Sequence, residues 1–397
     1  MHPLKRFLFT IYVIVALGIF IGGLISPEFR ARSNASAPLR DALLPPPAPI
    51  AVSVLYSTEK EAWLKEVIAD FQATKPLVDG HPIQLNLKQT GSREMYLAVL
   101  DGTEQPTVIS PASSLQSAIL QELSTRKSGQ PIVRAADCRS VVQTPLVLVA
   151  WKERADVLWG ATPPPDVWQK LHDALIDPKG WQTYQRPEWG YIKFGHTDPL
   201  KSNSGFMTIL LMAYDYFAKT GGLTSQEILS AAGFRQWFTE LESTIGKFGD
   251  STGTYMKDMV AYGPSVYDIV AVYEATAIEQ VPNALGRYGE LRVYYPPATI
   301  MSDHPFCVLN ADWVKPDQAK AAQVFVDYLL SQPAQEKALL KYGFRSVDPA
   351  ITLDRPDSPF VRYTANGLSI NLPPQIDLPD GDTLNTLLDF WSRNVSK

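Results

Sequence analysis

Small polar side chains gather in one loop of the chain, residues 195–206, which lies between two apolar segments. The polar side chains of this loop belong to Thr197, Asp198, Ser202, Asn203 and Ser204. A loop of this composition at the start of a helix can present backbone N–H groups and hydroxyls to a bound solute. Because no acid–base pair, nucleophile elbow or metal-ligand spacing accompanies the loop, the pattern predicts ligand binding and not catalysis. Capping of the following helix is the alternative role of Ser202 or Ser204.

The same order of strand, polar loop and helix recurs at three earlier positions. The strand-like segments are 50–55, 83–87 and 107–109, and each precedes serine, threonine or glycine residues. The candidate binding residues at these junctions are Ser57, Thr58, Gly91, Ser92 and Ser113. Four junctions of one design are more than helix capping alone requires, so we expect them to face a common ligand. Ser265 and Tyr267 join the candidate set, because a helix is expected over 265–278 and Tyr267 could close over a ligand at its start.

A rival chemistry comes from two loops that hold histidine and aspartate. The residues are His196, Asp198, Asp303 and His304, and their imidazoles and carboxylates would suit Zn²⁺ or another divalent ion in a metal-dependent enzyme. Neither pair shows the i, i+3 or i, i+4 spacing of ligands on a helix. The spacing therefore favours structural hydrogen bonds and turn caps, and we expect no metal, no other cofactor and no enzymatic activity.

Length and charge narrow the class of protein. A chain of 397 residues is too long for one small core and indicates two domains or lobes. The net charge of −5 is spread without a long basic run, which argues against nucleic acid as a partner. Only two cysteines occur, so a disulfide-rich scaffold and a cysteine-rich metal site are excluded.

The N-terminus predicts a membrane anchor. Lys5 and Arg6 precede an uncharged stretch, residues 7–26, which is about long enough to cross a bilayer as one helix. A cleaved signal peptide is the alternative, but the first small-x-small triplet, 35–37, stands before Pro38, which hinders cleavage. We therefore expect a transmembrane anchor over 1–27 and a stiff, proline-rich linker over 28–49.

The rest of the chain alternates strand-like and helical segments, which predicts an α/β protein with largely parallel sheets. The longest strand-like run, 141–151, contains Pro145, which suits a strand that leaves one lobe and enters another. A second extended segment, 291–297, is the candidate return. The expected organisation is a first lobe of 50–145 and 291–397, a second lobe of 146–290, and a cleft between them that the polar junctions face.

Several segments together resemble a known family. They are 57–61, 195–205, 302–314, 320–335 and 342–345. Over roughly residues 50 to 350 the chain resembles bacterial extracellular solute-binding proteins of the type II periplasmic-binding-protein fold. More distantly it is similar to molybdate and sulfate binders. Membrane-anchored members associated with von Willebrand factor A domains are the most similar in organisation.

The resemblance implies an extracytoplasmic receptor that captures a small polar or anionic solute and delivers it to an ABC-type permease or signals to a membrane partner. The alternative that it leaves open is an interaction scaffold without a ligand, working with a von Willebrand factor A domain protein. An extracytoplasmic location also bears on Cys138 and Cys307, each of which lies close to a proposed crossover. Since that environment is oxidising, we expect them to form a disulfide, with two buried free thiols as the alternative.

Overall fold

The computed structural model describes residues 10–18, 47–134, 137–160, 162 and 164–395. Most of the predicted anchor and linker, 1–27 and 28–49, lies outside these residues. Residues 10–18 are helical, and no helix among the described residues has the length and apolar character needed to cross a membrane. The anchor therefore stays a prediction.

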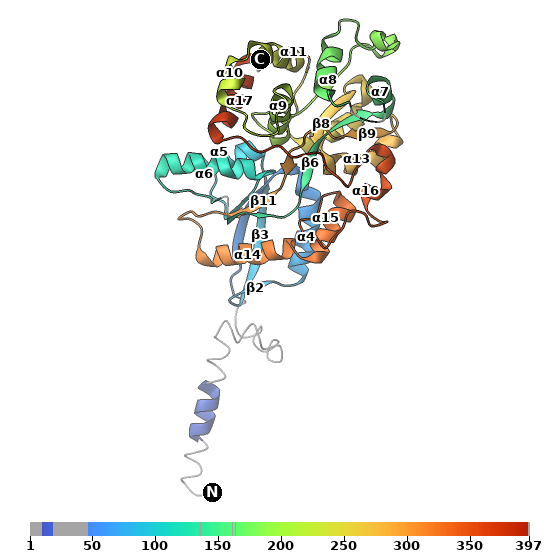
Figure 1. The fold of residues 1–397 in the computed structure, drawn as a ribbon. Helices are drawn as coiled ribbons and strands as arrows, with labels where there is room; N and C mark the ends of the chain where they lie inside the picture. The colour runs from blue at the N-terminus through green and yellow to red at the C-terminus, as the bar shows by residue number, and fades with distance from the viewer. Residues whose placement is uncertain (1–9, 19–46, 135–136, 161, 163, 396–397) are drawn as a thin grey trace.

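The first sheet has six strands in the order β2-β3-β1-β4-β11-β5. Its strands are β1 (Ile50–Tyr56), β2 (Leu77–Val78), β3 (His81–Gln89), β4 (Val108–Ser110), β5 (Arg139–Ser140) and β11 (Pro305–Val308). β1 is parallel to both β3 and β4, so the carboxyl ends of these three strands meet at one edge of the sheet. The helical elements that follow these strands are η1 (Thr58–Lys60), α4 (Glu61–Ala73), α5 (Ser92–Asp101), α6 (Ser114–Ser128), α14 (Pro316–Leu329) and α15 (Gln332–Tyr342). They form the lower half of the folded part of the molecule in Figure 1.

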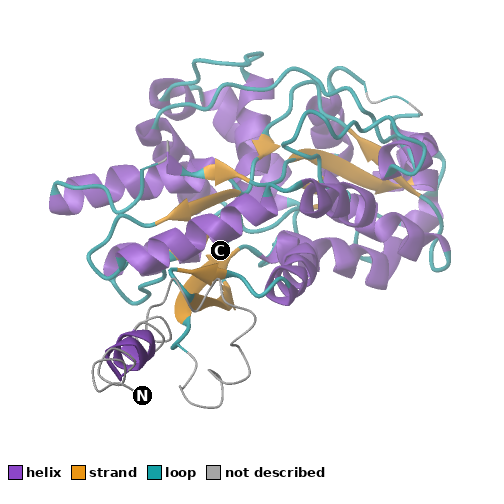
Figure 2. Ribbon diagram, turned by 90° about the horizontal axis from the view of Figure 1, so that it is seen from below, coloured by secondary structure: helices purple, strands orange, loops and turns teal. Residues whose placement is uncertain are grey.

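The second sheet has the order β10-β6-β8-β7, and β9 also pairs with β6. Its strands are β6 (Thr144–Trp151), β7 (Phe194–Gly195), β8 (Ile269–Tyr273), β9 (Leu291–Tyr294) and β10 (Met301–Ser302). The helical elements of this half are α7 (Lys152–Leu158), α8 (Val167–Ile176), η3 (Gly180–Tyr184), η4 (Pro187–Trp189), α9 (Asn203–Tyr216), α10 (Ser225–Ser230), α11 (Ala232–Ser243), α12 (Thr252–Tyr262), η5 (Gly263–Ser265) and α13 (Glu274–Leu285). Short elements near the C-terminus are α16 (Pro359–Arg362) and η6 (Thr364–Asn366). Helices surround the strands of both halves (Figure 2), and the prediction of two α/β lobes is confirmed.

Two expectations are wrong. The sheets are not largely parallel, because among the described strands only β1–β3, β1–β4 and β7–β8 pair in parallel, and the other six pairings are antiparallel. The helix predicted over 265–278 is instead the end of η5, the strand β8 and the start of α13. All five residues of β8 are buried between β6 and β7. A short, fully buried apolar strand has no polar face, so its sequence pattern cannot be distinguished from that of a buried helix.

The chain passes between the sheets in two stretches. Before β6, the N–H of Val141 donates to the carbonyl of His304 beside the first sheet, and from Thr144 the chain pairs within the second sheet. On the return, β9 and β10 pair with β6, and β11 pairs with β4 in the first sheet. The residue boundaries at 145 and 290 stay predictions.

A disulfide joins the two stretches. The Sγ atoms of Cys138 and Cys307 are 2.03 Å apart, so the predicted bridge is confirmed. Cys138 directly precedes β5, and Cys307 lies in the middle of β11, the neighbour of β5 in the first sheet. The bond therefore closes a loop that contains the whole second sheet.

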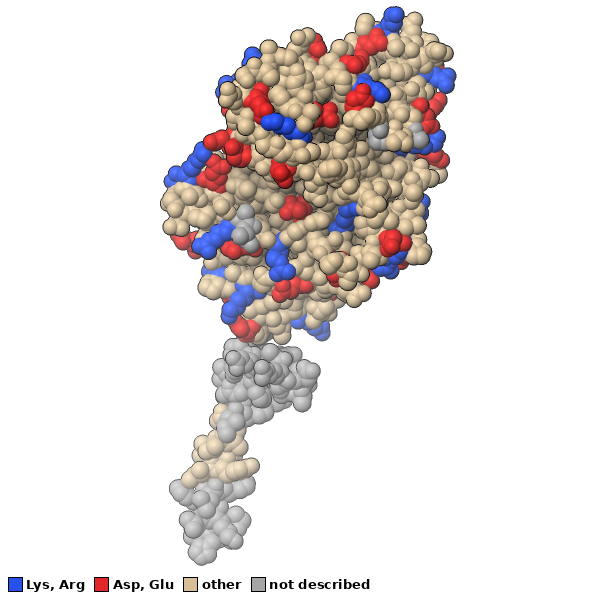
Figure 3. Space-filling view, viewed as in Figure 1, with Lys and Arg blue, Asp and Glu red and all other residues tan. Residues whose placement is uncertain are grey.

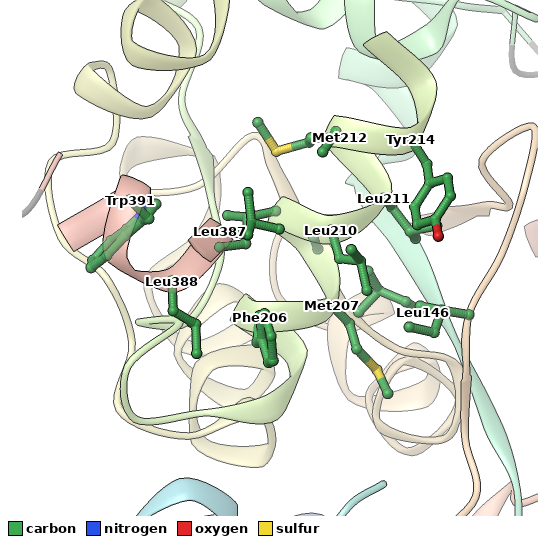
Figure 4. Packing of buried hydrophobic residues seen from close by; sticks show 14 of the residues in the cluster. Leu146, Phe206, Met207, Leu210, Leu211, Met212, Tyr214, Leu387, Leu388 and Trp391 are labelled. Atoms are coloured by element: carbon green, nitrogen blue, oxygen red, sulfur yellow. The ribbon is translucent and has the colours of Figure 1, made fainter. Parts of the chain in front are cut away.

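The C-terminal helix α17 (Gly381–Asn394) bridges the halves and does not belong to the first lobe alone. It contacts α10 and α9 as well as α6. Its apolar face places Leu387, Leu388 and Trp391 beside α9 (Figure 4), and the indole N–H of Trp391 donates to the Glu242 carboxylate at 2.6 Å. The amphipathic pattern of this helix predicts its buried face but not the partner against which that face packs.

Candidate functional site

A pocket lies where the loops of the two halves meet. It is lined by Ser57, Thr58, Glu59, Gly91, Ser92, Ala112, Ser202, Asn203, Asp250, Ser251, Thr252 and Tyr273. These residues come from the starts of η1, α5, α9 and α12, from the loop after β4 and from the end of β8. The first N–H groups of a helix have no partner within the helix and carry the positive end of its dipole. Four helical N-termini therefore converge on one pocket.

The side chains at the helix starts distinguish binding from capping. Ser57, Ser202 and Ser251 each occupy the N-cap position, and none of them, among the residues that the structure describes, caps its helix with its hydroxyl. By contrast, Ser113 accepts a hydrogen bond from the N–H of Leu115 and caps α6. The hydroxyls at three of the four helix starts are thus not used for capping, which was the alternative to ligand binding.

The pocket is closed in this structure. Its cavity volume is about 10 Å³, which is room for roughly one water molecule. A hydrogen bond of 2.7 Å from Gln116 Nε2 to Asn203 Oδ1 joins α6 to α9 across the pocket. The loops also approach at Gly91, where an added Cβ would lie 3.2 Å from the carbonyl oxygen of Lys201. In this form the pocket has no room for a solute larger than water.

A buried hydroxyl network supports the second side of the pocket. The hydroxyl of Ser204 lies 2.7 Å from that of Thr197 and 2.6 Å from that of Thr252. Ser202 lies 3.3 Å from the same Thr252 hydroxyl. At Gly205, an added Cβ would overlap the carbonyl oxygen of Thr197, so only glycine fits there. The network fixes the start of α9 relative to the start of α12.

On the first-sheet side of the pocket, Lys60, Ser57 and Glu59 form a chain of hydrogen bonds. The buried ammonium of Lys60 donates to the hydroxyl of Ser57 at 2.6 Å, and that hydroxyl donates to the carboxylate of Glu59 at 2.7 Å. Lys60 also contacts the Pro111 carbonyl at 3.0 Å and His304 Nδ1 at 3.2 Å. Burial lowers the pKa of Lys60 to about 8, although the Glu59 and Asp303 carboxylates act in the opposite direction. At neutral pH the ammonium is therefore mostly charged and offsets the charge of Glu59.

Comparison with known proteins identifies the family. Residues 52–345 match the family model described as bacterial extracellular solute-binding protein. The chain belongs to this family. Solved structures to which this solute-binding protein is similar include a periplasmic thiamin binding protein (12% identity, TM-score 0.60, covering 87% of this chain and 96% of that chain). They also include the substrate binding protein of an ABC transporter from Agrobacterium tumefaciens (13% identity, TM-score 0.57, covering 88% of this chain and 97% of that chain).

A third similar structure is the sulfate-binding protein SubI from Mycobacterium tuberculosis (17% identity, TM-score 0.51, covering 82% of this chain and 93% of that chain). No curated protein sequence matches the chain. At such low identities the likeness shows the fold alone, which is that of the type II periplasmic binding proteins. The family resemblance predicted from the sequence is confirmed.

Of the binding residues predicted from the sequence of this solute-binding protein, six line the pocket. They are Ser57, Thr58, Gly91, Ser92, Ser202 and Asn203. Thr197 and Ser204 lie beneath it in the hydroxyl network. Asp198 accepts a hydrogen bond from the N–H of Leu200 at 2.8 Å within its own loop.

Three candidates remain: Ser113 caps α6, and Ser265 and Tyr267 also lie away from the pocket lining. Ser265 is exposed and its hydroxyl donates to the carbonyl of Tyr262. The ring of Tyr267 packs on that of Tyr255 with centroids 4.9 Å apart. Both residues precede β8, and only the opposite end of that strand, at Tyr273, reaches the pocket.

Sequence reasoning missed six residues of the pocket lining, namely Glu59, Ala112, Asp250, Ser251, Thr252 and Tyr273. The Ser251–Thr252 pair at the start of α12 repeats the design of the other junctions and could have been found by it. Glu59 was read only as part of a helix start. Tyr273 ends a buried strand and has no distinguishing pattern in the sequence.

His196 and His304, the two histidines of the metal hypothesis, contact different residues. His196 contacts the Glu242 carboxylate at 2.9 Å and the carbonyl of Thr197 at 2.7 Å. His304 contacts Lys60, and a carboxylate oxygen of Asp303 accepts from the N–H of Ser114 at 2.7 Å. Among the described residues no group of three or more His, Cys, Asp or Glu side chains could hold a metal ion. The described geometry assigns structural hydrogen bonds to these residues.

The buried histidine His304 predicts a pH dependence of stability. Burial, together with the charge of Lys60, lowers the pKa of His304 well below the ordinary value. The unfolded chain, with a histidine pKa of about 6.5, takes up this proton first, so the free energy of unfolding falls as pH drops below that value. Between about pH 7.5 and 5.5 this residue should account for a loss of about 1.4 kcal/mol.

The variant His304→Asn tests this expectation in urea unfolding at the two pH values. Asparagine tolerates the φ of 41° at this position and keeps an acceptor for Lys60. The variant should lose less stability than the natural protein on acidification.

His196 acts with the opposite sign: although burial lowers its pKa, the Glu242 carboxylate more than offsets this and raises it. The stabilisation that His196 contributes is complete below the histidine pKa of the unfolded chain. Because His196 is present in both the natural protein and His304→Asn, its contribution cancels when their pH profiles are compared. Equal pH profiles for the two proteins would refute the assignment.

Proposed function

We propose that this solute-binding protein captures a small polar or anionic solute in the pocket between its two lobes. The observation that carries the proposal is the convergence of four helical N-termini whose N-cap residues, in the described part of the chain, do not use their side chains as caps. Unpaired N–H groups and the positive ends of helix dipoles favour oxygen acceptors and negative charge. The lining serine and threonine hydroxyls can donate or accept without adding a charge.

Glu59 narrows the chemistry of the solute. Its side chain is only 4% exposed, and its carboxylate accepts from Ser57 and, at 3.3 Å, from Thr58. A carboxylate repels a bare anion and accepts hydrogen bonds from a donor. The arrangement therefore favours a solute with an acceptor or anionic group for the helix N-termini and a donor group for Glu59.

Binding requires separation and reclosure of the lobes. When the lobes separate, the contact between Gln116 and Asn203 is lost, and both amides become free to bond the solute. Asn203 also donates to the hydroxyl of Tyr273 at 2.8 Å, which orients its amide at the base of the pocket. Reclosure would exclude water from many hydrogen bonds at once. Each is worth only about 1 kcal/mol net, so micromolar affinity needs this convergence.

The proposed setting is the outer face of the cytoplasmic membrane. The family consists of extracellular proteins that bind small solutes, and such proteins deliver them to ABC-type permeases. We propose the same delivery for this chain, with residues 1–27 as its membrane anchor and 28–49 as the spacer. The face seen in Figure 3 shows acidic and basic side chains interspersed, without a basic stripe that would suit nucleic acid.

Alanine substitutions on both sides of the pocket test the proposal. A thermal-shift screen of the purified full-length chain against oxyanions, amino acids, sugars and thiamin should find stabilisation by one ligand class. Thr58→Ala on the first side and Ser202→Ala on the second should each weaken that ligand by about 1–2 kcal/mol, because a buried partner is left unpaired. The fold should survive, as both residues lie on loops or helix starts.

The matched control is Ser265→Ala, which removes an exposed serine hydroxyl away from the pocket and should leave affinity unchanged. Affinity is measured by calorimetry with the ligand from the screen. A screen without any stabilising class, or equal affinities for the Ser202 and Ser265 variants, would end the proposal.

A further inference from the structure

A second and larger cavity lies in the lobe of the second sheet. Its volume is about 510 Å³, within the range of small-molecule sites. It is bounded by the start of α8, the end of α9, α11 and the segment at 297–298 between β9 and β10. Figure 4 shows Tyr214, in its wall, on the side of α9 away from Leu387 and Trp391 of α17. The cavity shares no lining residue with the pocket between the lobes.

The floor of this cavity is aromatic. Trp168, Tyr214 and Trp237 are buried, and Tyr216 is partly buried beside them. Trp237 packs against Tyr216, with ring centroids 5.3 Å apart, and stacks on His172, with ring centroids 5.7 Å apart. Trp237 is only 7% exposed, and its indole N–H has no hydrogen-bond partner in the structure as described. Because Trp237 lines the cavity, this buried N–H is a candidate donor for an acceptor group on a bound molecule.

The charge of the cavity is negative. Asp215 lines it, and no hydrogen bond or ion pair from the described residues reaches its carboxylate. Lys219 in the same wall is paired with Glu227 at 2.5 Å and with the carbonyl of Gly222 at 3.1 Å. Asp166, at the exposed rim, adds a second carboxylate, which is paired with Lys170 at 3.5 Å. Burial, and then the charge of Asp166, raises the pKa of Asp215 to about 6, so this carboxylate is still ionised at neutral pH.

We propose that this cavity binds a small organic ammonium ion that carries a hydroxyl or another hydrogen-bond acceptor. Tyr216 is the partly exposed ring of the aromatic floor, and its face attracts a cation that lies within about 6 Å of the ring centre, an attraction that grows when water is excluded. Asp215 supplies the countercharge, and the acceptor group of the ion takes the unpaired N–H of Trp237. The site is additional to the proposed solute pocket and does not depend on it.

Choline is the probe for this site, since it combines a quaternary ammonium with a hydroxyl. Titration of the full-length protein, followed by tryptophan fluorescence and by calorimetry, should show saturable binding of choline. The neutral analogue 3,3-dimethylbutan-1-ol has the same shape without the charge and should bind at least tenfold more weakly. Asp215→Asn, which removes the carboxylate charge at nearly constant volume, should weaken choline at least tenfold and leave the neutral analogue unchanged.

Two variants serve as controls. Asp389→Asn makes the same chemical change at an exposed position of α17, and Glu59→Gln removes the carboxylate of the pocket between the lobes. Both should bind choline as the natural protein does, and thermal unfolding verifies that each variant is folded. Absence of saturable choline binding, equal binding of the neutral analogue, or a loss in Glu59→Gln that matches the loss in Asp215→Asn would overturn the proposal. The last outcome would place the cation between the lobes instead.

Discussion

Replacing Arg345 with methionine should lower the free energy of unfolding by about 3–5 kcal/mol, since it leaves a buried carboxylate without its cation. Arg345 holds Glu274 through two hydrogen bonds of 2.8 Å, from Nε and from one terminal guanidinium nitrogen. The Glu274 side chain is fully buried and that of Arg345 is 8% exposed. Burial raises the pKa of Glu274 although Arg345 acts to lower it, which shows how strongly the site disfavours an unpaired charge.

The pair also connects distant parts of the chain. Glu274 is the first residue of α13, directly after β8 of the second sheet, whereas Arg345 follows α15 beside the first sheet. The guanidinium further donates to the carbonyls of Ser369 at 2.6 Å and Ile370 at 2.8 Å, and the hydroxyl of Tyr295 donates to Glu274. Removal of Arg345 thus leaves a carboxylate and two carbonyls without their donor. This explains why the expected loss is larger than that of a single hydrogen bond.

Urea unfolding of the full-length chain measures the loss. The control is Arg355→Met, which breaks partly exposed ion pairs with Asp357 and Glu336 and should change stability little. The double variant Arg345→Met with Glu274→Met should recover part of the loss, because no buried charge remains unpaired. If Arg345→Met proved as stable as Arg355→Met, the pair would not contribute to stability as argued.

The sequence predicted the pocket as far as local chemistry and strand order determine it. Ser57 follows β1 and Ser92 follows β3, and these parallel neighbours end at the same edge of the sheet. Their polar residues therefore meet, whichever way the rest of the chain folds. Ser202 and Asn203 reach the same pocket from the second lobe because α9 starts where the two halves face each other.

The parts that sequence reasoning missed depend on contacts between distant residues. Nothing local indicates that Gln116 bonds Asn203, 87 positions later, or that Lys60 is buried against His304. Ser265 and Tyr267 were placed at the pocket on the expectation of a helix, and the strand β8 carries that segment to the other end of the sheet. Tertiary packing determines each of these features, so the chain of hydrogen bonds from Lys60 through Ser57 to Glu59 could be found only in the folded molecule.

Loss of the disulfide should have an effect comparable with the loss of Arg345. The bond between Cys138 and Cys307 spans a sequence separation of 169 residues. Loop-closure entropy for a loop of that length gives about 5 kcal/mol of stabilisation, and native disulfides typically contribute about 2–5 kcal/mol on removal. The loop contains the whole second sheet, so in the unfolded chain the bond restricts a long segment.

The double variant Cys138→Ala with Cys307→Ala should therefore unfold at lower urea concentration than the oxidised protein, and a reducing agent should lower the stability of the natural protein to a similar value. The same reducing agent should leave the double variant unchanged, which separates the disulfide from any general effect of the reagent.

Both cysteines belong to the first-sheet side of the loop, where β5 and β11 already lie side by side, so the folded geometry needs no adjustment when the bond is absent. The loss should then appear mainly as greater freedom of the unfolded chain, with the affinity of the pocket for its solute retained. Two free thiols in the denatured, unreduced protein would show that the bond does not form, and an oxidised protein no more stable than the double variant would contradict the entropic argument.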